Sequence, residues 1–181
     1  VHPLQRTWCM WEHRVGGKSY QDNLDCFAEF NTVEGFWRYW NHVPRPSDFF
    51  YTKKENRMTL GERNVIAFSV FEKGVQPCWE DPKNTNGGEW RIRKFKNFQE
   101  LDYAWFDAVL LLIGESYDPA LKLVGVRVVD SSNADRQKQL YNVEVWFEDT
   151  KQQKKIEKIL QRFNLENTKF YYREHKTSFE K

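Results

Sequence analysis

An aromatic ring and a carboxylate stand side by side at Trp79 and Glu80, within the run Pro77-Cys78-Trp79-Glu80-Asp81. The Watson–Crick edge of guanine presents an N–H beside an NH₂ group, and a carboxylate supplies two acceptors at a matching separation. A neighbouring aromatic ring can stack on the base whose edge the acid binds. Taken alone, however, the pair is weak evidence, and a buried tryptophan beside a solvated glutamate is the favoured interpretation.

Signatures of catalysis are scarce in the rest of the chain. The four histidines are scattered, and no HExxH, GxSxG, P-loop or GxGxxG motif is present. The glycine pair Gly87-Gly88 could cradle a phosphate, but a turn between two strands is the favoured interpretation. Asp102 and Asp107 are expected on the solvated side of a helix. We therefore expect a protein that is not an enzyme and that holds no metal or cofactor.

The composition is that of an ordinary globular chain. Its 181 residues are 40% hydrophobic and 30% charged, and we expect a single domain over residues 1–181. No internal repeat is present, and Pro44–Arg63 is expected to be a long, polar loop. The formal net charge is only +2, whereas a protein that holds long duplexes by neutralising phosphates is usually far more basic. If nucleic acid is the ligand, the contact should be small and specific.

Cysteine usage and hydropathy indicate the compartment. Cys9, Cys26 and Cys78 are three in number and contain no CxxC pair, which is typical of reduced thiols in an intracellular protein. The longest apolar run, Ala108–Ile113, is far too short to span a membrane. The N-terminal residues lack the basic and apolar stretches of a signal peptide. We expect a monomer in the cytoplasm.

Most of the chain has the pattern of β-strands, which are rich in β-branched and aromatic residues. Two of the predicted strands should form an antiparallel pair around the polar loop Ser131–Gln139. The predicted strands are Thr7–Glu12, Val65–Phe71, Trp90–Phe95, Leu123–Val129, Tyr141–Phe147 and Thr168–Tyr172.

Three segments have helical period instead, at 33–40, 105–113 and 156–163. Thr32 is placed to cap the first helix, Gly114 should end the second, and the third should begin at Asp149 or Thr150. Strands with three amphipathic helices predict an α+β domain, in which helices cover one face of an antiparallel sheet. The other face is then free for a ligand.

The aromatic residues can be assigned from their context. Trp11, Trp90 and Trp105 are expected in the core. Trp37 lies on a helix that is aromatic on more than one face, so part of it should be exposed to a partner. Tyr20 follows a flexible glycine pair in a polar loop and needs either a packing partner or a ligand; core packing is favoured.

Several motifs, in order along the chain, resemble the eukaryotic translation initiation factor 4E family, whose members bind the mRNA 5′ cap. The resemblance spans nearly the whole chain, and the WED…N..GG.W block is its most specific part. It implies a curved antiparallel sheet with three α-helices on the convex face and the ligand site in the concave face. The matching residues are His2-Pro3-Leu4-Gln5 with Trp8 and Trp11, Val33-Glu34-Gly35-Phe36-Trp37 through Asn41-His42, Pro77–Asp81 with Asn84, Gly87, Gly88 and Trp90, then Trp105, Leu112–Ser116 and Trp146.

The resemblance also implies the residues of the cap site. Tyr20 and Trp79 match the two rings that enclose the base, Glu80 the acid on the guanine edge, and Trp146 the tryptophan at the N7-methyl group. Methylation at N7 makes the purine positive, so electron-rich rings gain cation–π attraction. The nearest replacements for the family's triphosphate-binding cations are Arg127, Arg136 and Lys138.

Three departures from the family pattern affect this expectation. Tyr20 replaces the usual tryptophan, as in some divergent, often repressive members, and Tyr is the weaker cation–π partner. Arg127 shares a strand face with Gly125 and could point into the site, but a solvated surface arginine is equally compatible with the pattern. Only a few residues follow His175, so the loop over later nucleotides should be short or absent.

On the convex side, the resemblance implies a surface that seats a helical peptide of the scaffold factor 4G or of a competing regulator. Phe106 should enlarge its apolar area. The expected function is cap binding combined with recruitment of a scaffold that promotes translation initiation. The alternatives are a cap-binding repressor on the same fold and a protein-interaction module with a weakened cap site. The implied partner-binding residues are His2, Pro3, Val33, Trp37, Asp107 and Leu110.

Overall fold

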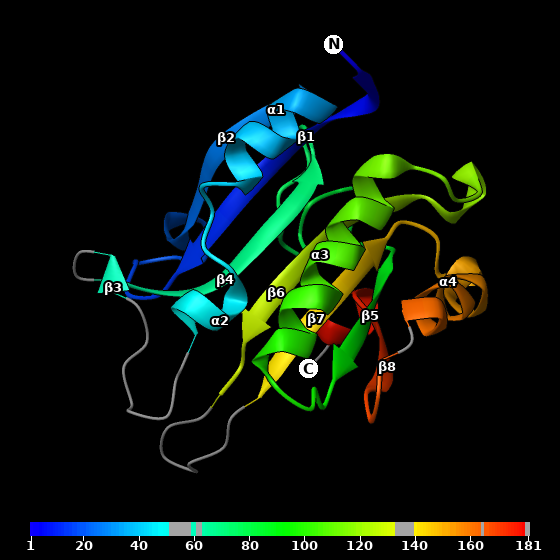
Figure 1. The fold of residues 1–181 in the computed structure, drawn as a ribbon. Coiled ribbons are helices and arrows are strands. Elements are labelled where there is room, and N and C mark those ends of the chain that lie inside the picture. Colours follow the sequence, from blue (N-terminus) through cyan, green and yellow to red (C-terminus); the bar gives the residue numbers. More distant parts are fainter. Residues whose placement is uncertain (51–58, 61–62, 133–139, 164, 180–181) are drawn as a thin grey trace.

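The computed structural model describes residues 1–50, 59–60, 63–132, 140–163 and 165–179. Its main element is a curved antiparallel sheet with the strand order β2-β1-β4-β6-β7-β5-β8, and β3 pairs with β4 at one end (Figure 1). The strands are β1 (Pro3–Arg14), β2 (Leu24–Thr32), β3 (Thr59–Leu60), β4 (Arg63–Glu72), β5 (Gly88–Arg93), β6 (Leu123–Asp130), β7 (Tyr141–Phe147) and β8 (Lys169–Glu174).

The helices gather on one face of this sheet, where α3 crosses its centre (Figure 1). They are α1 (Val33–Trp40), α2 (Pro46–Phe49), α3 (Phe98–Gly114) and α4 (Gln153–Leu160), and a last turn, α5 (Lys176–Phe179), follows β8. Short 3-10 turns occur at Gln21–Asn23, Pro119–Leu121, Thr150–Gln152 and Gln161–Phe163. The predicted fold class, an antiparallel sheet covered by helices on one face, is confirmed. None of the described helices is long and apolar enough to cross a membrane.

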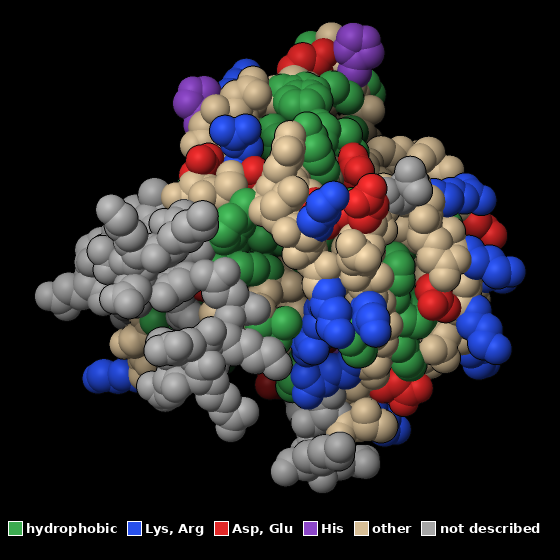
Figure 2. All heavy atoms as spheres, turned by 60° about the horizontal axis from the view of Figure 1, so that its bottom comes forward, with side chains coloured by type: hydrophobic (Ala, Val, Ile, Leu, Met, Phe, Trp, Pro, Cys, Tyr) green, Lys and Arg blue, Asp and Glu red, His purple; other side chains and the backbone are tan. Residues whose placement is uncertain are grey.

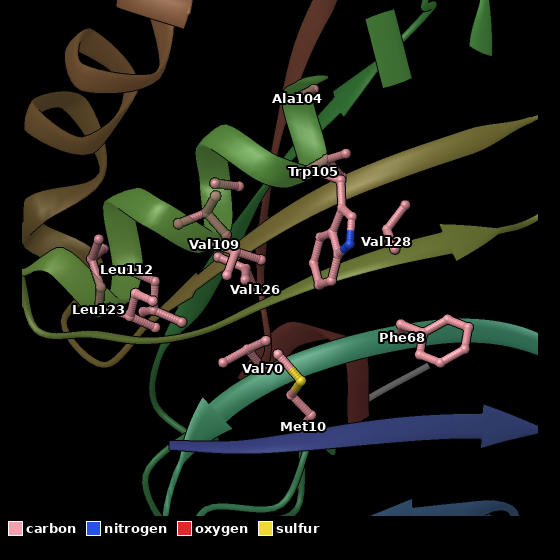
Figure 3. Packing of buried hydrophobic residues seen from close by; sticks show 14 of the residues in the cluster. Met10, Phe68, Val70, Ala104, Trp105, Val109, Leu112, Leu123, Val126 and Val128 are labelled. Carbon is pink, nitrogen blue, oxygen red and sulfur yellow. The ribbon is translucent and has the colours of Figure 1, made fainter. Parts of the chain in front are cut away.

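The hydrophobic core fills the space between the sheet and α3. Side chains of α3 meet the inward side chains of three neighbouring strands (Figure 3). Successive strand residues point to opposite faces, so Val143, Val145 and Phe147 of β7 enter this core while the residues between them face away from the helices. The core residues that Figure 3 labels are Met10, Phe68, Val70, Ala104, Trp105, Val109, Leu112, Leu123, Val126 and Val128.

Helix ends follow their capping residues. The Thr32 hydroxyl accepts a hydrogen bond of 2.9 Å from the Gly35 N–H, as the sequence predicts. The second predicted helix ends at Gly114, and the residue after it, Glu115, takes the left-handed conformation with φ 48°. The third helix begins with a 3-10 turn that Asp149 caps.

Two expectations about the fold were incomplete. Strand β2 was not predicted, because only its Ala28 and Phe30 are buried and the remaining side chains of this edge strand are polar or solvent-facing. The segment Pro44–Arg63 is not loop throughout. It contains α2, which Pro46 begins and whose Phe49 ring packs 4.5 Å from Phe68. Residues 51–58 and 61–62 of this segment lie outside the described part.

Candidate functional site

A second, smaller cluster of apolar residues lies on the sheet face away from the helices. Phe71, Val75, Val124 and Trp146 are buried there, with Trp11 and Trp79 packed against them. The predicted core packing of Trp11 is met by this second cluster, and Trp90 and Trp105 belong to the main core as predicted. Charged side chains surround this cluster. We call Glu89, Arg91, Arg127, Glu144 and Trp146 the concave floor.

Two buried carboxylates of the floor hold the two tryptophans of the site. The indole N–H of Trp146 donates to Glu144 Oε2 at 2.9 Å, and that of Trp79 donates to Glu89 Oε1 at 3.2 Å. Arg91 lies between the acids, with its Nε 2.9 Å from Glu89 Oε2 and 3.7 Å from Glu144 Oε1. The two indoles therefore have their orientation fixed by charged acceptors.

The electrostatics of the two acids differ. Burial alone would raise the pKa of Glu89, but contacts with His175 and Arg91 outweigh it and lower the pKa to about 2. Burial and the neighbouring charge of Glu89 raise the pKa of Glu144. Glu89 therefore stays ionised to a lower pH than Glu144 does.

Arg127 faces the concave side, as its position beside Gly125 on β6 allows. Its Nη1 lies 3.2 Å from Glu144 Oε2, and its guanidinium lies 5.7 Å from the ring centre of Trp146. Only 12% of the side chain is exposed, so the interpretation as a solvated surface arginine was wrong. Burial opposes the charge of Arg127, yet Glu144 raises its pKa above the ordinary value.

His13 borders the concave floor next to Arg127. Its Nδ1 lies 3.3 Å from Arg127 Nη2, and desolvation followed by the charge of Arg127 lowers its pKa to about 4. A neutral imidazole can accept a hydrogen bond from the guanidinium.

His175 is buried on the other side of the floor, and no motif in the sequence predicted a role for it. Its Nδ1 lies 2.7 Å from the backbone oxygen of Asn84, so Nδ1 carries the proton. The ring lies 4.5 Å from that of Trp146, and Nε2 is 3.4 Å from Glu89 Oε1. Glu89, Arg91 and Glu144 were missed as well, because charged residues that alternate with apolar ones in a strand are usually solvated.

The walls of the site are two loops that carry aromatic rings. Tyr20, in the loop between β1 and β2, donates a hydrogen bond of 2.9 Å to the backbone oxygen of Pro77. Tyr20 is 41% exposed, so the favoured interpretation as a core residue was wrong. Trp79 follows two residues after Pro77, and the Arg173 guanidinium lies 4.4 Å from its ring centre. Glu80 is exposed beside Trp79.

The motif residues around Trp79 have structural roles. The buried Asn84 side chain donates to the backbone oxygens of Gln76 and Cys78, both at 2.9 Å, and holds the loop closed. Gly87 lies where the chain passes the backbone of Phe147, and a Cβ there would overlap the Phe147 carbonyl. This close approach accounts for the glycine, so a phosphate cradle is not needed to explain it.

The structure brings together Tyr20, Trp79, Trp146 and Arg127 on one face, with Glu80 at the edge. Arg136 and Lys138 lie outside the described residues. Within the described ranges, no group of three or more His, Cys, Asp or Glu side chains could hold a metal ion. The three cysteines are free thiols.

The expected partner-binding residues lie on the opposite, helical face. Val33 and Trp37 of α1 are each 37% exposed, and the Trp37 ring lies 6.0 Å from that of Phe106 on α3. Asp107 follows Phe106, and Leu110 is one turn further on; both are half-buried. Burial raises the pKa of Asp107. Hydrophobic side chains gather over α1 in Figure 2.

The N-terminus borders this surface. His2 and Pro3 are exposed, and the His2 backbone oxygen accepts a hydrogen bond of 2.9 Å from the Val33 N–H. The His2 ring lies 2.7 Å from Glu34 Oε1. The hydrogen bond from the His2 backbone N–H, followed by this contact with the ring, lowers the pKa of Glu34 to about 2. We call His2, Pro3, Val33, Trp37, Phe106, Asp107 and Leu110 the helical surface.

Comparison with known proteins places the chain in a family. Residues 3–181 match the model of the eukaryotic initiation factor 4E family. The chain is 37% identical to eukaryotic translation initiation factor 4E of Bos taurus and 36% identical to that of Homo sapiens, over 120 residues in each case. Each match covers 65% of this chain and 49% of the relative, so the chain spans about half the length of these relatives.

Solved structures give the same result over a larger part of the fold. A complex of C. elegans eIF4E-3 with the 4E-binding protein Mextli has a TM-score of 0.78 at 25% identity and covers 98% of this chain and 95% of that chain. Ascaris suum eIF4E-3 with an m7G cap has a TM-score of 0.77 at 27% identity, over 96% and 91% of the two chains. The chain belongs to the eukaryotic initiation factor 4E family.

Proposed function

We propose that this protein binds the 7-methylguanosine cap of mRNA on its concave face and a scaffold initiation factor on its helical surface. The observation that carries the proposal is the meeting of two loops above the floor, where Tyr20 donates to the backbone of Pro77 beside Trp79. The two loops each carry an aromatic ring, and the exposed carboxylate of Glu80 lies beside one of the rings. These groups can recognise a flat, positive purine.

The Trp79 ring is suited to a cation. In the structure the Arg173 guanidinium, a flat positive group, lies 4.4 Å from its centre. The methylated base has the same sign and shape, and it gains from the same ring quadrupole. Glu80 then accepts from the two donors on the guanine edge, which an adenine edge cannot supply together.

Trp146 has the proposed role of contacting the N7-methyl group. It is 1% exposed, and Arg127 and His175 lie against its ring. Contact with the methyl group therefore requires one of these side chains to move. For the cap phosphates we propose Arg127, with Arg136 and Lys138, which follow β6 in the sequence. Because Arg127 already pairs with Glu144, it would share its charge between the carboxylate and a phosphate.

The helical surface is proposed to bind an amphipathic helical peptide. Trp37 is an exposed aromatic anchor, Val33 and Leu110 extend the apolar area, and Asp107 can accept from a basic or polar side chain of the partner. The structural relative from C. elegans binds the 4E-binding protein Mextli. A scaffold that promotes initiation is the proposed partner, and a regulator that represses it is the alternative.

A fluorescence titration tests cap binding, because stacking on Trp79 should quench its emission. We expect 7-methyl-GTP to bind at least about tenfold more tightly than GTP, since only the methylated base is positive. Trp79→Phe should remove most of the quenching. Equal affinities for the two nucleotides would contradict the cap-binding proposal, and so would the absence of binding by either.

A further inference from the structure

A strip of positive and aromatic side chains leads away from Trp79 along the sheet edge formed by β5 and β8. In this antiparallel pair, Glu89 lies opposite Arg173, Arg91 opposite Tyr171 and Arg93 opposite Lys169. Directly opposed residues lie on the same face of a sheet. Because Glu89 and Arg91 belong to the concave floor, the opposed β8 residues lie on the concave face too. We call Arg93, Lys169, Tyr171 and Arg173 the basic strip.

Arg93 is a partly buried cation of this strip. Among the described residues it forms no ion pair, and its Nε is buried without a hydrogen-bond acceptor. Burial and the neighbouring charge of Arg91 lower its pKa. Arg91, in contrast, has Glu89 and Glu144 beside it. An anion bound at Arg93 would satisfy the guanidinium and relieve its repulsion from Arg91.

Tyr171 supplies an aromatic surface between the positive groups. The Arg93 guanidinium lies 5.2 Å from the centre of its ring, and the residue is still 39% exposed. Lys169, two residues earlier on the same face, is exposed as well. Cations that alternate with an exposed ring are the arrangement with which proteins bind single-stranded nucleic acid, because phosphates meet the charges and bases stack on the ring.

The strip is continuous with the proposed cap site. Arg173 lies over the Trp79 ring at 4.4 Å, and the strip extends from there to Lys169. Four residues of strand span about 13 Å at ~3.3 Å per residue. That length fits a short run of nucleotides.

From this geometry we infer that the basic strip binds the first nucleotides of the RNA chain that follows the cap. The inference rests on the proposed function, because the cap places the RNA at Trp79. It assigns a phosphate to Arg93 and a stacked base to Tyr171. Recognition is independent of sequence, since every base has a face that can stack.

The test compares 7-methyl-GTP with a capped RNA of eight nucleotides, in titrations at two salt concentrations. We expect the capped RNA to bind about tenfold more tightly than 7-methyl-GTP at low salt, with a steeper salt dependence. Arg93→Gln and Tyr171→Ala should each remove most of this gain and leave the affinity for 7-methyl-GTP unchanged. Arg93→Lys should retain much of it, and Lys155→Gln on α4 is the matched loss of charge on the opposite face.

The outcomes separate the inference from the function on which it rests. If 7-methyl-GTP binds but the capped RNA gains nothing, the strip does not bind RNA, and its cations serve only to protect the edge strand β8 from pairing. The same conclusion follows if the two variants keep the full gain or if Lys155→Gln loses it equally. If 7-methyl-GTP itself does not bind, the proposed function fails.

Discussion

The hydroxyl group of Tyr20 donates a hydrogen bond of 2.9 Å to the backbone oxygen of Pro77, and this bond joins the two loops that carry the aromatic rings of the site. Tyr20 therefore contributes a hydrogen bond in addition to the aromatic ring that it shares with the tryptophan usual at this position in the family. It fixes the distance between the walls before a ligand arrives, which lowers the entropy lost on binding.

Changes at Tyr20 separate the ring from its hydroxyl group. We expect Tyr20→Phe to weaken 7-methyl-GTP binding by about 0.5–1.5 kcal/mol, the usual value of one hydrogen bond. Tyr20→Trp should tighten binding modestly, because indole is the better cation–π partner. Fluorescence titration or calorimetry measures both. Weaker binding by the Trp variant would show that the loop is built around the hydroxyl group of Tyr20.

Glu80 is expected to read the guanine edge. Glu80→Ala should cost about 2–4 kcal/mol of 7-methyl-GTP binding, because two donors of the enclosed base lose a charged acceptor. Glu157→Ala on α4 removes an acid from the opposite face and should leave the affinity unchanged. A loss at Glu80 within the error of the titration would identify it as an ordinary surface acid.

Trp37 is expected to anchor the partner helix. Trp37→Ala should abolish binding of a scaffold peptide and keep the 7-methyl-GTP affinity within about twofold, since the two sites lie on opposite faces of the sheet. Tyr103→Ala, which removes another exposed ring of the helical face, is the matched control. A folded Trp37→Ala protein that loses cap affinity would contradict the independence of the faces, and one that keeps the peptide would place the partner elsewhere.

Gly125 makes room for the ring that supports Trp146. It lies opposite Phe71 on β4, and a Cβ at this position would overlap the Phe71 ring, which packs 5.3 Å from that of Trp146. Gly125→Ala should therefore lower the free energy of unfolding by about 1–3 kcal/mol through overpacking. Gly114→Ala is the control, because a Cβ there meets no atom within 4 Å. Urea denaturation measures both, and equal stabilities of the two variants would show that Phe71 moves aside without cost.

His13 makes stability depend on pH. Its pKa in the folded protein is about 4, below the ordinary 6.5, so the unfolded chain binds the proton more readily. Stability is therefore lost as pH falls from about 6.5 towards 4, by up to about 1.4 kcal/mol per pH unit. Between pH 7 and 5 the wild type should lose about 2 kcal/mol more than His13→Gln. Parallel curves of unfolding free energy against pH would show that folding does not shift the pKa of His13.

Elements with a clear period could be predicted from the sequence. The helix at 33–40 has both a regular apolar spacing and the capping residue Thr32. The strand Tyr141–Phe147 was predicted with its observed bounds because every residue on one of its faces is apolar. Strand β2 was missed because it lies at an edge, where the sheet requires only Ala28 and Phe30 to be buried.

The floor of the site could be predicted only in part. The face of Arg127 follows from alternation along one strand, but its partner Glu144 depends on the register between β6 and β7. Glu89 and Glu144 lie on strands that are more than fifty residues apart in the chain, and only the β5–β7 pairing brings them together. Pairing at long range is not encoded in local pattern, so two buried acids resembled solvated ones.

The order of the strands has a consequence for how a ligand can leave. Arg127, Glu144 and Trp146 project from β6 and β7, which are paired on both sides within the sheet, whereas Tyr20 and Trp79 stand on connecting loops. Segments held by few backbone hydrogen bonds open at much lower free energy than central strands do. The loops can therefore separate, release what they enclose and close again while the strands beneath stay paired. The lifetime of a complex would then be set by loop fluctuations and not by the unfolding of the domain.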